Sequence, residues 1–210
     1  MSDAPPIRWY FDFISPFAYL HWPKVRALMG EREVACVPIL FATVLDAHGH
    51  KGPAEIPGKR EFTYRYVLWQ ARRAGVPLVF PPAHPFNPLA ALRLGIAAGA
   101  SVEAIDAIFD WIWVQGRAGD SVEALAPVCA RLGMDPALPA DAAVKQALRQ
   151  NTEEALQAGV FGVPTLAVGN LLFWGNDAHA FALEALRDPA LFDDAQMRRL
   201  ASLPVGVRRR

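Results

Sequence analysis

Cysteine is scarce in this 210-residue sequence, which contains only Cys36 and Cys129. The two lie far apart in the sequence and do not form a C-x-x-C motif, which is typical of thiol redox sites. Cys36 lies in an apolar run and Cys129 on a helical pattern, so both are expected to be free thiols in the core. The sequence therefore offers no thiol pair for disulfide exchange.

An excess of positive charge is also absent. Lys and Arg together number 21, as do Asp and Glu, so the formal net charge is +0. Nucleic-acid-binding domains normally carry a basic excess that displaces counterions, and here only residues 208–210 form an Arg cluster. We interpret that cluster as a solvated tail and predict no nucleic-acid partner.

Long uninterrupted apolar segments are missing as well. Residues 1–6 contain neither a basic segment nor an apolar run, so no signal peptide is predicted. The longest charge-free stretch, residues 74–92, contains five prolines, which exclude a simple membrane-spanning helix. We therefore expect a soluble, cytoplasmic protein without a membrane partner.

Apolar residues, in contrast, are abundant. They make up 53% of the chain, with 12 Phe and 6 Trp, which excludes a disordered chain. The length suits one large domain, or one domain with a second inserted into it. We expect most Trp residues to anchor the core, although Trp69 and Trp113 could line an apolar pocket for an aromatic ligand.

Strand patterns occur only near the two ends of the chain. Residues 7–13 predict a strand, Pro16 begins a helix that Gly30 ends, and residues 33–40 predict a second, buried strand. Such a strand-helix-strand unit makes its two strands parallel. Residues 163–168 and 171–174 predict a hairpin around Gly169-Asn170, and a final helix covers residues 177–187.

The middle of the chain is helical. After a polar loop at residues 47–58, helical patterns cover residues 60–74, 88–98, 102–115, 121–132 and 141–158, and Asp120 with Glu123 predicts a capping box for the fourth of them. The simplest architecture is an α/β fold in which a sheet domain is interrupted by an all-helical insertion. We place the sheet domain at residues 1–43 and 145–210, and the insertion at residues 44–144.

The turn from the first strand to the first helix is the first candidate site. Ser15 lies where the unpaired N–H groups and partial positive charge of a helix N-terminus stabilise anions, including thiolates. Its hydroxyl could donate a hydrogen bond to such an anion. Ser15 could equally be only an N-cap, a role that serine favours before Pro16, and the two roles are compatible.

Two further candidates lie near the C-terminal hairpin. A cis Val163-Pro164 bond would free the Val163 backbone to pair with an extended peptide ligand, whereas an ordinary trans proline at a strand end is the alternative. Asp177, after Asn176, could cap the last helix or accept hydrogen bonds from a ligand ammonium group.

The histidines give weaker indications. His48 and His50 could touch a metal, but no third ligand is evident, so we interpret them as loop residues and predict no metal site. We interpret His21 as a surface or packed residue, and neither His84 nor His179 has a partner that can be identified from the sequence.

Three segments taken together resemble a known family. They are residues 11–20 (FDFISPFAYL), 159–165 (GVFGVPT) and 173–177 (FWGND), and residues 57–78 and 85–93 are similar to the same family. The sequence resembles the 2-hydroxychromene-2-carboxylate isomerases, which are related to kappa-class glutathione transferases within the DsbA-like thioredoxin folds. The resemblance covers nearly the whole chain and implies a thioredoxin-like sheet domain with a helical insertion.

The resemblance also implies a glutathione site. Ser15 would face the glutathione sulfur, Val163-Pro164 with a cis bond would hold its cysteinyl unit, and Asn176 with Asp177 would hold its γ-glutamyl end. Lys59 would reach the site from the insertion and pair with a substrate carboxylate. This chain departs from the family at Ala178-His179, where Arg often follows the Asp, and at His48-Gly49-His50, where Gly-Asn is usual.

The implied activity is a glutathione-dependent cis-trans isomerisation. The enzyme would interconvert 2-hydroxychromene-2-carboxylate and trans-o-hydroxybenzylidenepyruvate in aromatic catabolism, with Ser15 and Lys59 as catalytic residues. The alternatives are a kappa-like transferase that conjugates electrophiles, and a catalytically silent thioredoxin-like module that binds glutathione or peptides. The predicted partners are glutathione and a small aromatic carboxylate, and a homodimer is left open.

Overall fold

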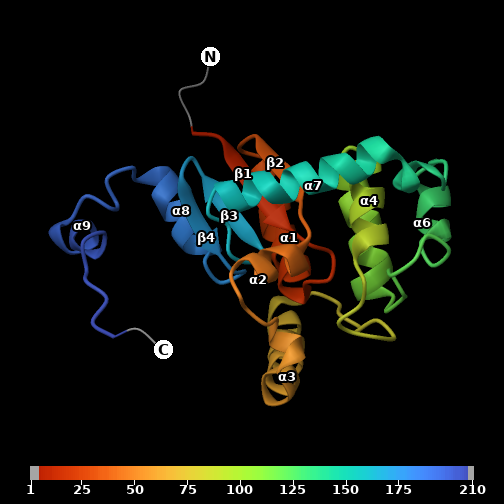
Figure 1. The fold of residues 1–210 in the computed structure, drawn as a ribbon, viewed down its shortest axis with the longest axis horizontal. Coiled ribbons are helices and arrows are strands. Elements are labelled where there is room, and N and C mark those ends of the chain that lie inside the picture. The colour runs from red at the N-terminus through yellow and green to blue at the C-terminus, as the bar shows by residue number, and fades with distance from the viewer. Residues whose placement is uncertain (1–4, 208–210) are drawn as a thin grey trace.

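The computed structural model describes residues 5–207, and a mixed four-stranded sheet forms its centre (Figure 1). The strands are β1 (Ile7–Phe11), β2 (Val34–Pro38), β3 (Thr165–Val168) and β4 (Leu171–Trp174), in the order β2-β1-β3-β4. β1 pairs parallel with β2 and antiparallel with β3, and β3 pairs antiparallel with β4. This confirms the α/β thioredoxin-like fold and the C-terminal hairpin.

Helices surround the sheet and fill the middle of the chain. They are α1 (Pro16–Met29), α2 (Phe41–Ala47), α3 (Pro57–Ala74), α4 (Leu89–Ala97), α5 (Val102–Phe109), α6 (Ala126–Arg131), α7 (Ala142–Gln157), α8 (His179–Arg187) and α9 (Ala195–Leu200), with the single turns η1 (Pro53–Glu55), η2 (Asp110–Val114, π-helical) and η3 (Leu138–Ala140). Across residues 5–207, none of these helices combines the length and the apolarity needed to cross a bilayer.

The strands occur only in the two flanking segments of the described chain, and the segment between β2 and β3 is helical. Figure 1 shows α4 and α6 on one side of the molecule, α8 on the other, and α3 projecting from the body between them. The predicted domain boundary at residues 144–145 falls within the first turn of α7, a helix that contacts both β2 and α4. The division into two domains therefore stays a prediction.

One aromatic core joins the sheet to the helical segment between β2 and β3, which we call the helical lobe. The rings of Trp9 and Phe11 stack at 4.2 Å on β1, and Phe13 packs edge-on against Phe109 of α5 at 4.9 Å. Trp113 is fully buried, and its Nε1–H donates to the carbonyl oxygen of Phe13 at 2.9 Å. Trp113 is thus a core anchor rather than part of a ligand pocket, and it fixes the chain immediately before Ser15.

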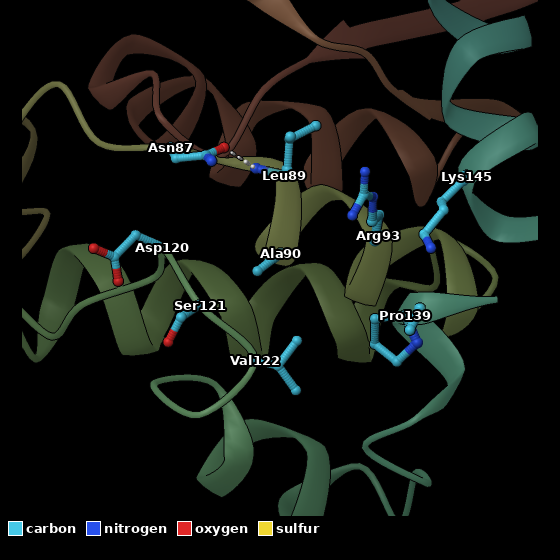
Figure 2. A pocket seen from close by; sticks show the side chains of 10 residues that line it. Asn87, Leu89, Ala90, Arg93, Asp120, Ser121, Val122, Pro139 and Lys145 are labelled. Carbon is cyan, nitrogen blue, oxygen red and sulfur yellow. Dashed lines mark hydrogen bonds between the residues drawn. The ribbon is translucent and has the colours of Figure 1, made fainter. Parts of the chain in front are cut away.

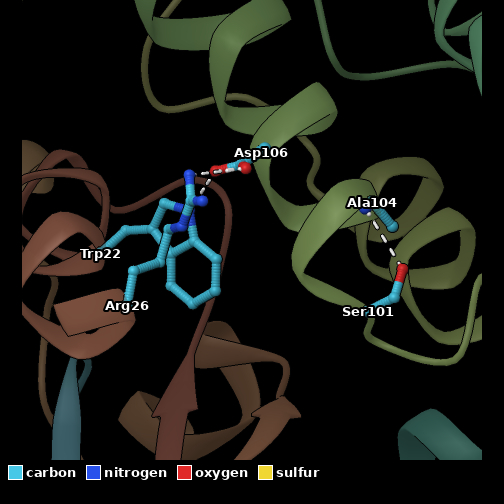
Figure 3. A network of polar contacts seen from close by, with 5 residues as sticks. All are labelled: Trp22, Arg26, Ser101, Ala104 and Asp106. Atoms are coloured by element: carbon cyan, nitrogen blue, oxygen red, sulfur yellow. Dashed lines mark hydrogen bonds and ion pairs between the residues drawn. The ribbon is translucent and has the colours of Figure 1, made fainter. Parts of the chain in front are cut away.

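A polar contact joins α1 to α5 at the edge of this core (Figure 3). Trp22 Nε1–H donates to Asp106 Oδ1 at 2.7 Å, and Arg26 pairs with the other carboxylate oxygen at 2.8 Å. One carboxylate of the helical lobe is therefore held by two side chains of α1, spaced four residues apart on one helix face.

Two sequence-based expectations about residues 120–132 need correction. The helix predicted at residues 121–132 begins only at Ala126, because Pro127 cannot donate a backbone hydrogen bond and its ring excludes a helical residue four positions earlier. The Asp120–Glu123 capping box does not form. Instead, Ser121 Oγ accepts a hydrogen bond from the Ala124 N–H.

Other helices differ from the prediction in extent. α3 starts at Pro57 rather than residue 60, and α2 and α9 were not predicted. The Arg cluster at residues 208–210 lies outside the described residues.

Candidate active site

The strand pairing brings the three candidate segments to one end of the sheet. Tyr10 pairs with Thr165, so the chain after β1 runs beside residues 163–164, which precede β3. Thr165 also pairs with Trp174, so residues 175–177 leave β4 at the same end. Ser15, Val163 and Asn176 therefore lie at the same end of the sheet, although about 150 residues separate Ser15 from the other two.

Ser15 caps α1, as one of its two predicted roles requires. Its backbone is extended, and its buried Oγ accepts a hydrogen bond from the Ala18 N–H at 3.2 Å. That bond uses the oxygen as an acceptor and leaves the hydroxyl proton available for donation. Pro16 has no N–H, and the Phe17 N–H has no partner among the described residues. Ser15 and Phe17 therefore offer two donors at the positive end of a helix.

A buried carboxyl group supports this turn and was missed from the sequence. Asp12 is fully buried, and its two oxygens accept hydrogen bonds from the Ile14 N–H at 3.1 Å and the Phe41 N–H at 3.0 Å. Burial raises its pKa to about 7, although both hydrogen bonds act in the opposite direction. Asp12 thus ties the turn before Ser15 to the start of α2.

The Val163-Pro164 bond is cis, which confirms the prediction made from the resemblance. Within residues 5–207, neither the N–H nor the C=O of Val163 has a hydrogen-bond partner, whereas the Pro164 carbonyl accepts from the Gly175 N–H at 2.9 Å. The backbone of Val163 is therefore available to a peptide-like ligand, and that of Pro164 helps to hold the following turn.

Asn176 is held by two helices. Lys24 Nζ of α1 donates to its carbonyl oxygen at 3.1 Å, and its side-chain Nδ2 donates to Gln70 Oε1 of α3 at 3.4 Å. Its Oδ1 is buried and has no hydrogen-bond partner in the described structure. An unsatisfied buried acceptor is costly, so this oxygen is a natural partner for a ligand N–H.

Asp177 is exposed beside this group and does not cap α8, which shows no side-chain cap. Desolvation by burial lowers the pKa of Lys24. The nearby Asp177 carboxylate acts in the opposite direction, because it favours the charged ammonium form. The two charged groups form no ion pair, but they are close enough to interact electrostatically at the end of β4.

Lys59 lies in the first turn of α3 and is exposed, without a hydrogen bond or ion pair to any residue from 5 to 207. The same turn is nevertheless joined to the Ser15 segment. Arg60 and the Tyr64 hydroxyl both donate to the His84 carbonyl oxygen, at 2.8 and 2.7 Å, and His84 Nε2 lies 2.9 Å from the Ile14 carbonyl oxygen. Because that oxygen only accepts, His84 Nε2 carries the proton.

The partners of His84 could not be identified from the sequence, and neither could those of His21 and His179. Trp9 Nε1–H donates to His21 Nδ1 at 3.2 Å, so the Nε2 of a neutral His21 carries its proton and donates to His179 Nδ1 at 2.9 Å. Burial lowers the pKa of His21 to about 3, which keeps it neutral. His179, at the departure Ala178-His179, therefore fastens the start of α8 to α1.

The two cysteines lie outside this arrangement. Cys36 lies on β2, opposite Trp9, and Cys129 lies on α6. Burial raises the pKa of the Cys36 thiol to about 12, and burial also raises that of Cys129. Neither is a nucleophile near neutral pH, and residues 15–18 contain no sulfur.

Comparisons with known proteins agree with this geometry. The family model of the DSBA-like thioredoxin domain matches residues 6–187. The 2-hydroxychromene-2-carboxylate isomerase of Pseudomonas putida is 32% identical, over 85% of this chain and 92% of that protein. Glutathione S-transferase kappa 2 of Caenorhabditis elegans is 22% identical, over 80% of this chain and 83% of that protein.

Among solved structures, a selenomethionine form of 2-hydroxychromene-2-carboxylate isomerase superposes with a TM-score of 0.74. Its sequence is 26% identical, and the match covers 93% of this chain and 97% of that one. The likeness extends over both the sheet and the helical segment between β2 and β3.

Proposed function

The chain belongs to the 2-hydroxychromene-2-carboxylate isomerase family within the DsbA-like thioredoxin group, and on that premise we propose that it is a glutathione-dependent cis-trans isomerase. The proposed reaction interconverts 2-hydroxychromene-2-carboxylate and trans-o-hydroxybenzylidenepyruvate. The observation that carries the proposal is the pair of free donors, the Ser15 hydroxyl and the Phe17 N–H, at the N-terminus of a helix that has no thiol of its own.

Glutathione fits the hydrogen-bonding groups that have no partner among the described residues at this end of the sheet. The backbone of Val163 matches a peptide unit, and the buried Asn176 Oδ1 matches an N–H donor. Asp177 matches the γ-glutamyl ammonium group, and Lys24 beside it matches a carboxylate. When bound, glutathione supplies a thiolate that adds reversibly to the conjugated double bond of the substrate and so permits rotation about it.

The protein's own groups would stabilise the negative charges of the thiolate and of the substrate carboxylate. Ser15 donates a hydrogen bond to the sulfur anion, and the α1 N-terminus adds its partial positive charge. Together they lower the thiol pKa by roughly one to three units, which makes the thiolate a major species near neutral pH. Lys59, exposed on the first turn of α3, would pair with the substrate carboxylate.

The experiment follows isomerisation spectroscopically with and without glutathione, while free glutathione is measured in parallel. We expect turnover to require glutathione and the glutathione concentration to stay constant, because the cofactor is regenerated. Wild-type turnover without glutathione would contradict the cofactor proposal. Stoichiometric loss of glutathione with electrophiles would instead support a transferase, the activity named in the kappa-class relative.

A further inference from the structure

A hollow of about 250 Å³ lies in the helical lobe (Figure 2). It is bounded by α4, the segment from Asp120 to Val122, η3 and the first turn of α7. None of the residues proposed to contact glutathione or substrate lines it. The hollow is therefore separate from the candidate active site, and a ligand bound in it would be independent of the proposed reaction.

One end of the hollow is basic. Arg93 of α4 is half-buried, and its Nε is buried without a hydrogen-bond partner in the part of the chain that the structure describes. Figure 2 shows the Lys145 side chain at the same end of the hollow as Arg93, and this lysine likewise has no ion pair with any residue from 5 to 207. A buried guanidinium N–H without an acceptor is unfavourable, and a bound anion would satisfy it.

The opposite end carries polar groups with free hydrogen-bonding capacity. Ser121 Oγ accepts from the Ala124 N–H at 3.1 Å, and its hydroxyl, second to the backbone N–H of Glu123 itself, lies close enough to the Glu123 carboxylate to help lower the pKa of that group. Asn87 Oδ1 accepts from the Leu89 N–H at 3.1 Å, which leaves the Asn87 amide group to donate. The Asp120 carboxylate lies beside them in Figure 2 and accepts hydrogen bonds only.

The remaining lining residues form an apolar wall and are Leu89, Ala90, Val122, Pro139 and Ala140. A ligand that satisfied the whole hollow would need an anionic group at one end, a compact apolar body and a hydroxyl at the other end. The two cations select against neutral molecules, and the apolar wall selects against a bare inorganic anion.

We propose that this hollow is a binding site for a small organic carboxylate of that form. The carboxylate would accept hydrogen bonds from Arg93 and Lys145, and the apolar body would lie against Ala90 and Val122. The distal hydroxyl would donate to Asp120.

The test is a titration of isotopically labelled protein, followed by two-dimensional NMR at pH 7. The probes are 4-hydroxybenzoate, its neutral analogue 4-hydroxybenzyl alcohol, and inorganic phosphate. We expect 4-hydroxybenzoate to shift the amide signals around Arg93 and Val122, and to bind at least tenfold more tightly than either of the other probes.

Single-charge variants then locate the site. Arg93→Met should weaken 4-hydroxybenzoate binding at least tenfold, and Lys145→Met at least threefold. Arg149→Met removes one positive charge from an exposed position of the same helix, α7, and should leave the affinity unchanged. Because Lys145 is exposed, its variant keeps the test valid even if the Arg93 variant folds poorly.

Three outcomes would overturn the proposal. In the first, the neutral alcohol or phosphate binds as well as the carboxylate. In the second, the affinity does not change in Lys145→Met, or it falls equally in Arg149→Met. In the third, the shifts cluster around Ser15 and are abolished by Lys59→Met, which would place the ligand in the active site and leave this hollow to solvent.

Discussion

The Ser15 hydroxyl can perform its two predicted roles together because they use different parts of the group. Its oxygen accepts the Ala18 N–H and so caps the start of α1, while its proton remains available to a sulfur anion. The second role stays a proposal, and it can be separated from the first by comparison with another N-cap. Ser101 caps α5 in the same way: its Oγ accepts a hydrogen bond from the Ala104 N–H at 3.3 Å (Figure 3).

Ser15→Ala is expected to lower glutathione-dependent turnover roughly 10- to 150-fold at pH 7, because a hydrogen bond to a charged group contributes about 1.5–3 kcal/mol. The loss should shrink at alkaline pH, where the thiol ionises without help. Isomerisation rates from pH 6 to 9 provide the measurement.

Ser101→Ala is the matched control for this experiment. Both substitutions remove an N-cap, at a cost of about 1 kcal/mol of stability, but only Ser15→Ala should change turnover. Equal activity of Ser15→Ala and wild type at pH 7 would contradict the proposed contact with sulfur.

Asp12 makes the stability of the protein depend on pH. Its pKa is raised by burial to about 7 in the folded state, from about 3.9 in an unfolded chain. Between about pH 4 and pH 7 the folded state therefore binds more protons than the unfolded chain. The stabilising contribution of Asp12 to the free energy of unfolding is fully present below about pH 4. It is lost as the pH rises through about 7, by an amount on the order of 4 kcal/mol.

Asp12→Asn is expected to abolish this pH dependence. The amide has one acceptor oxygen, so either the Ile14 or the Phe41 N–H loses its partner, at a cost of about 1–3 kcal/mol. Urea unfolding at several pH values from 4 to 8.5 measures both effects. The free energy of unfolding of wild type should fall relative to that of the variant as the pH rises, and parallel curves would refute the assignment.

At the scale of elements, α1 organises the candidate site. Its first residues present Ser15 and Phe17, Lys24 in its middle holds the Asn176 carbonyl, and Trp22 with Arg26 holds Asp106 of α5. One helix thus sets the position of the anion-binding turn relative to both the β4–α8 turn and the helical lobe.

The two bonds to Asp106 should differ in strength. Trp22 is only 3% exposed, so loss of its acceptor would leave a buried N–H unsatisfied. The ion pair joins side chains that are 49% and 32% exposed, where solvent screens the attraction.

We therefore expect Asp106→Ala to lower the free energy of unfolding by about 1–3 kcal/mol and Arg26→Ala by less than about 1 kcal/mol. Thermal and urea unfolding of both variants measure the difference. If Arg26→Ala were the more destabilising change, the ion pair rather than the Trp22 bond would hold the two helices together.

At the scale of the whole molecule, the candidate site depends on three distant parts of the chain. The β1–α1 turn, the start of β3 and the β4–α8 turn meet only in the folded state. A ligand that contacts all three binds the folded protein and not the unfolded chain, so it stabilises the whole molecule by mass action.

Glutathione at about 100 times its dissociation constant should therefore raise the free energy of unfolding by about 2.7 kcal/mol. Asp177→Ala should weaken binding by about 1.5–3 kcal/mol and remove most of that gain at the same concentration. Asp193→Ala, at another exposed position, is the control. Calorimetry and thermal unfolding measure both quantities, and equal stabilisation of all three proteins would place the γ-glutamyl end elsewhere.

The sequence by itself predicted the elements whose signals are local. The aromatic strand before Ser15-Pro16, the capped start of α1 and the Gly169-Asn170 turn follow from backbone preferences of neighbouring residues. The family resemblance added the cis Val163-Pro164 bond, which propensity alone disfavours. Local signals failed where two of them competed, as when Pro127 overrode the expected start of α6.

Only the tertiary structure decided the partners of the buried polar groups. His84 meets the Ile14 carbonyl 70 residues away, and His21 meets His179 at a separation of 158 residues. Asp12 looks like one polar residue in an aromatic run until folding brings Phe41 to it. Such contacts leave no periodicity or spacing in the chain, because they depend on which elements pack together and not on the residues beside them.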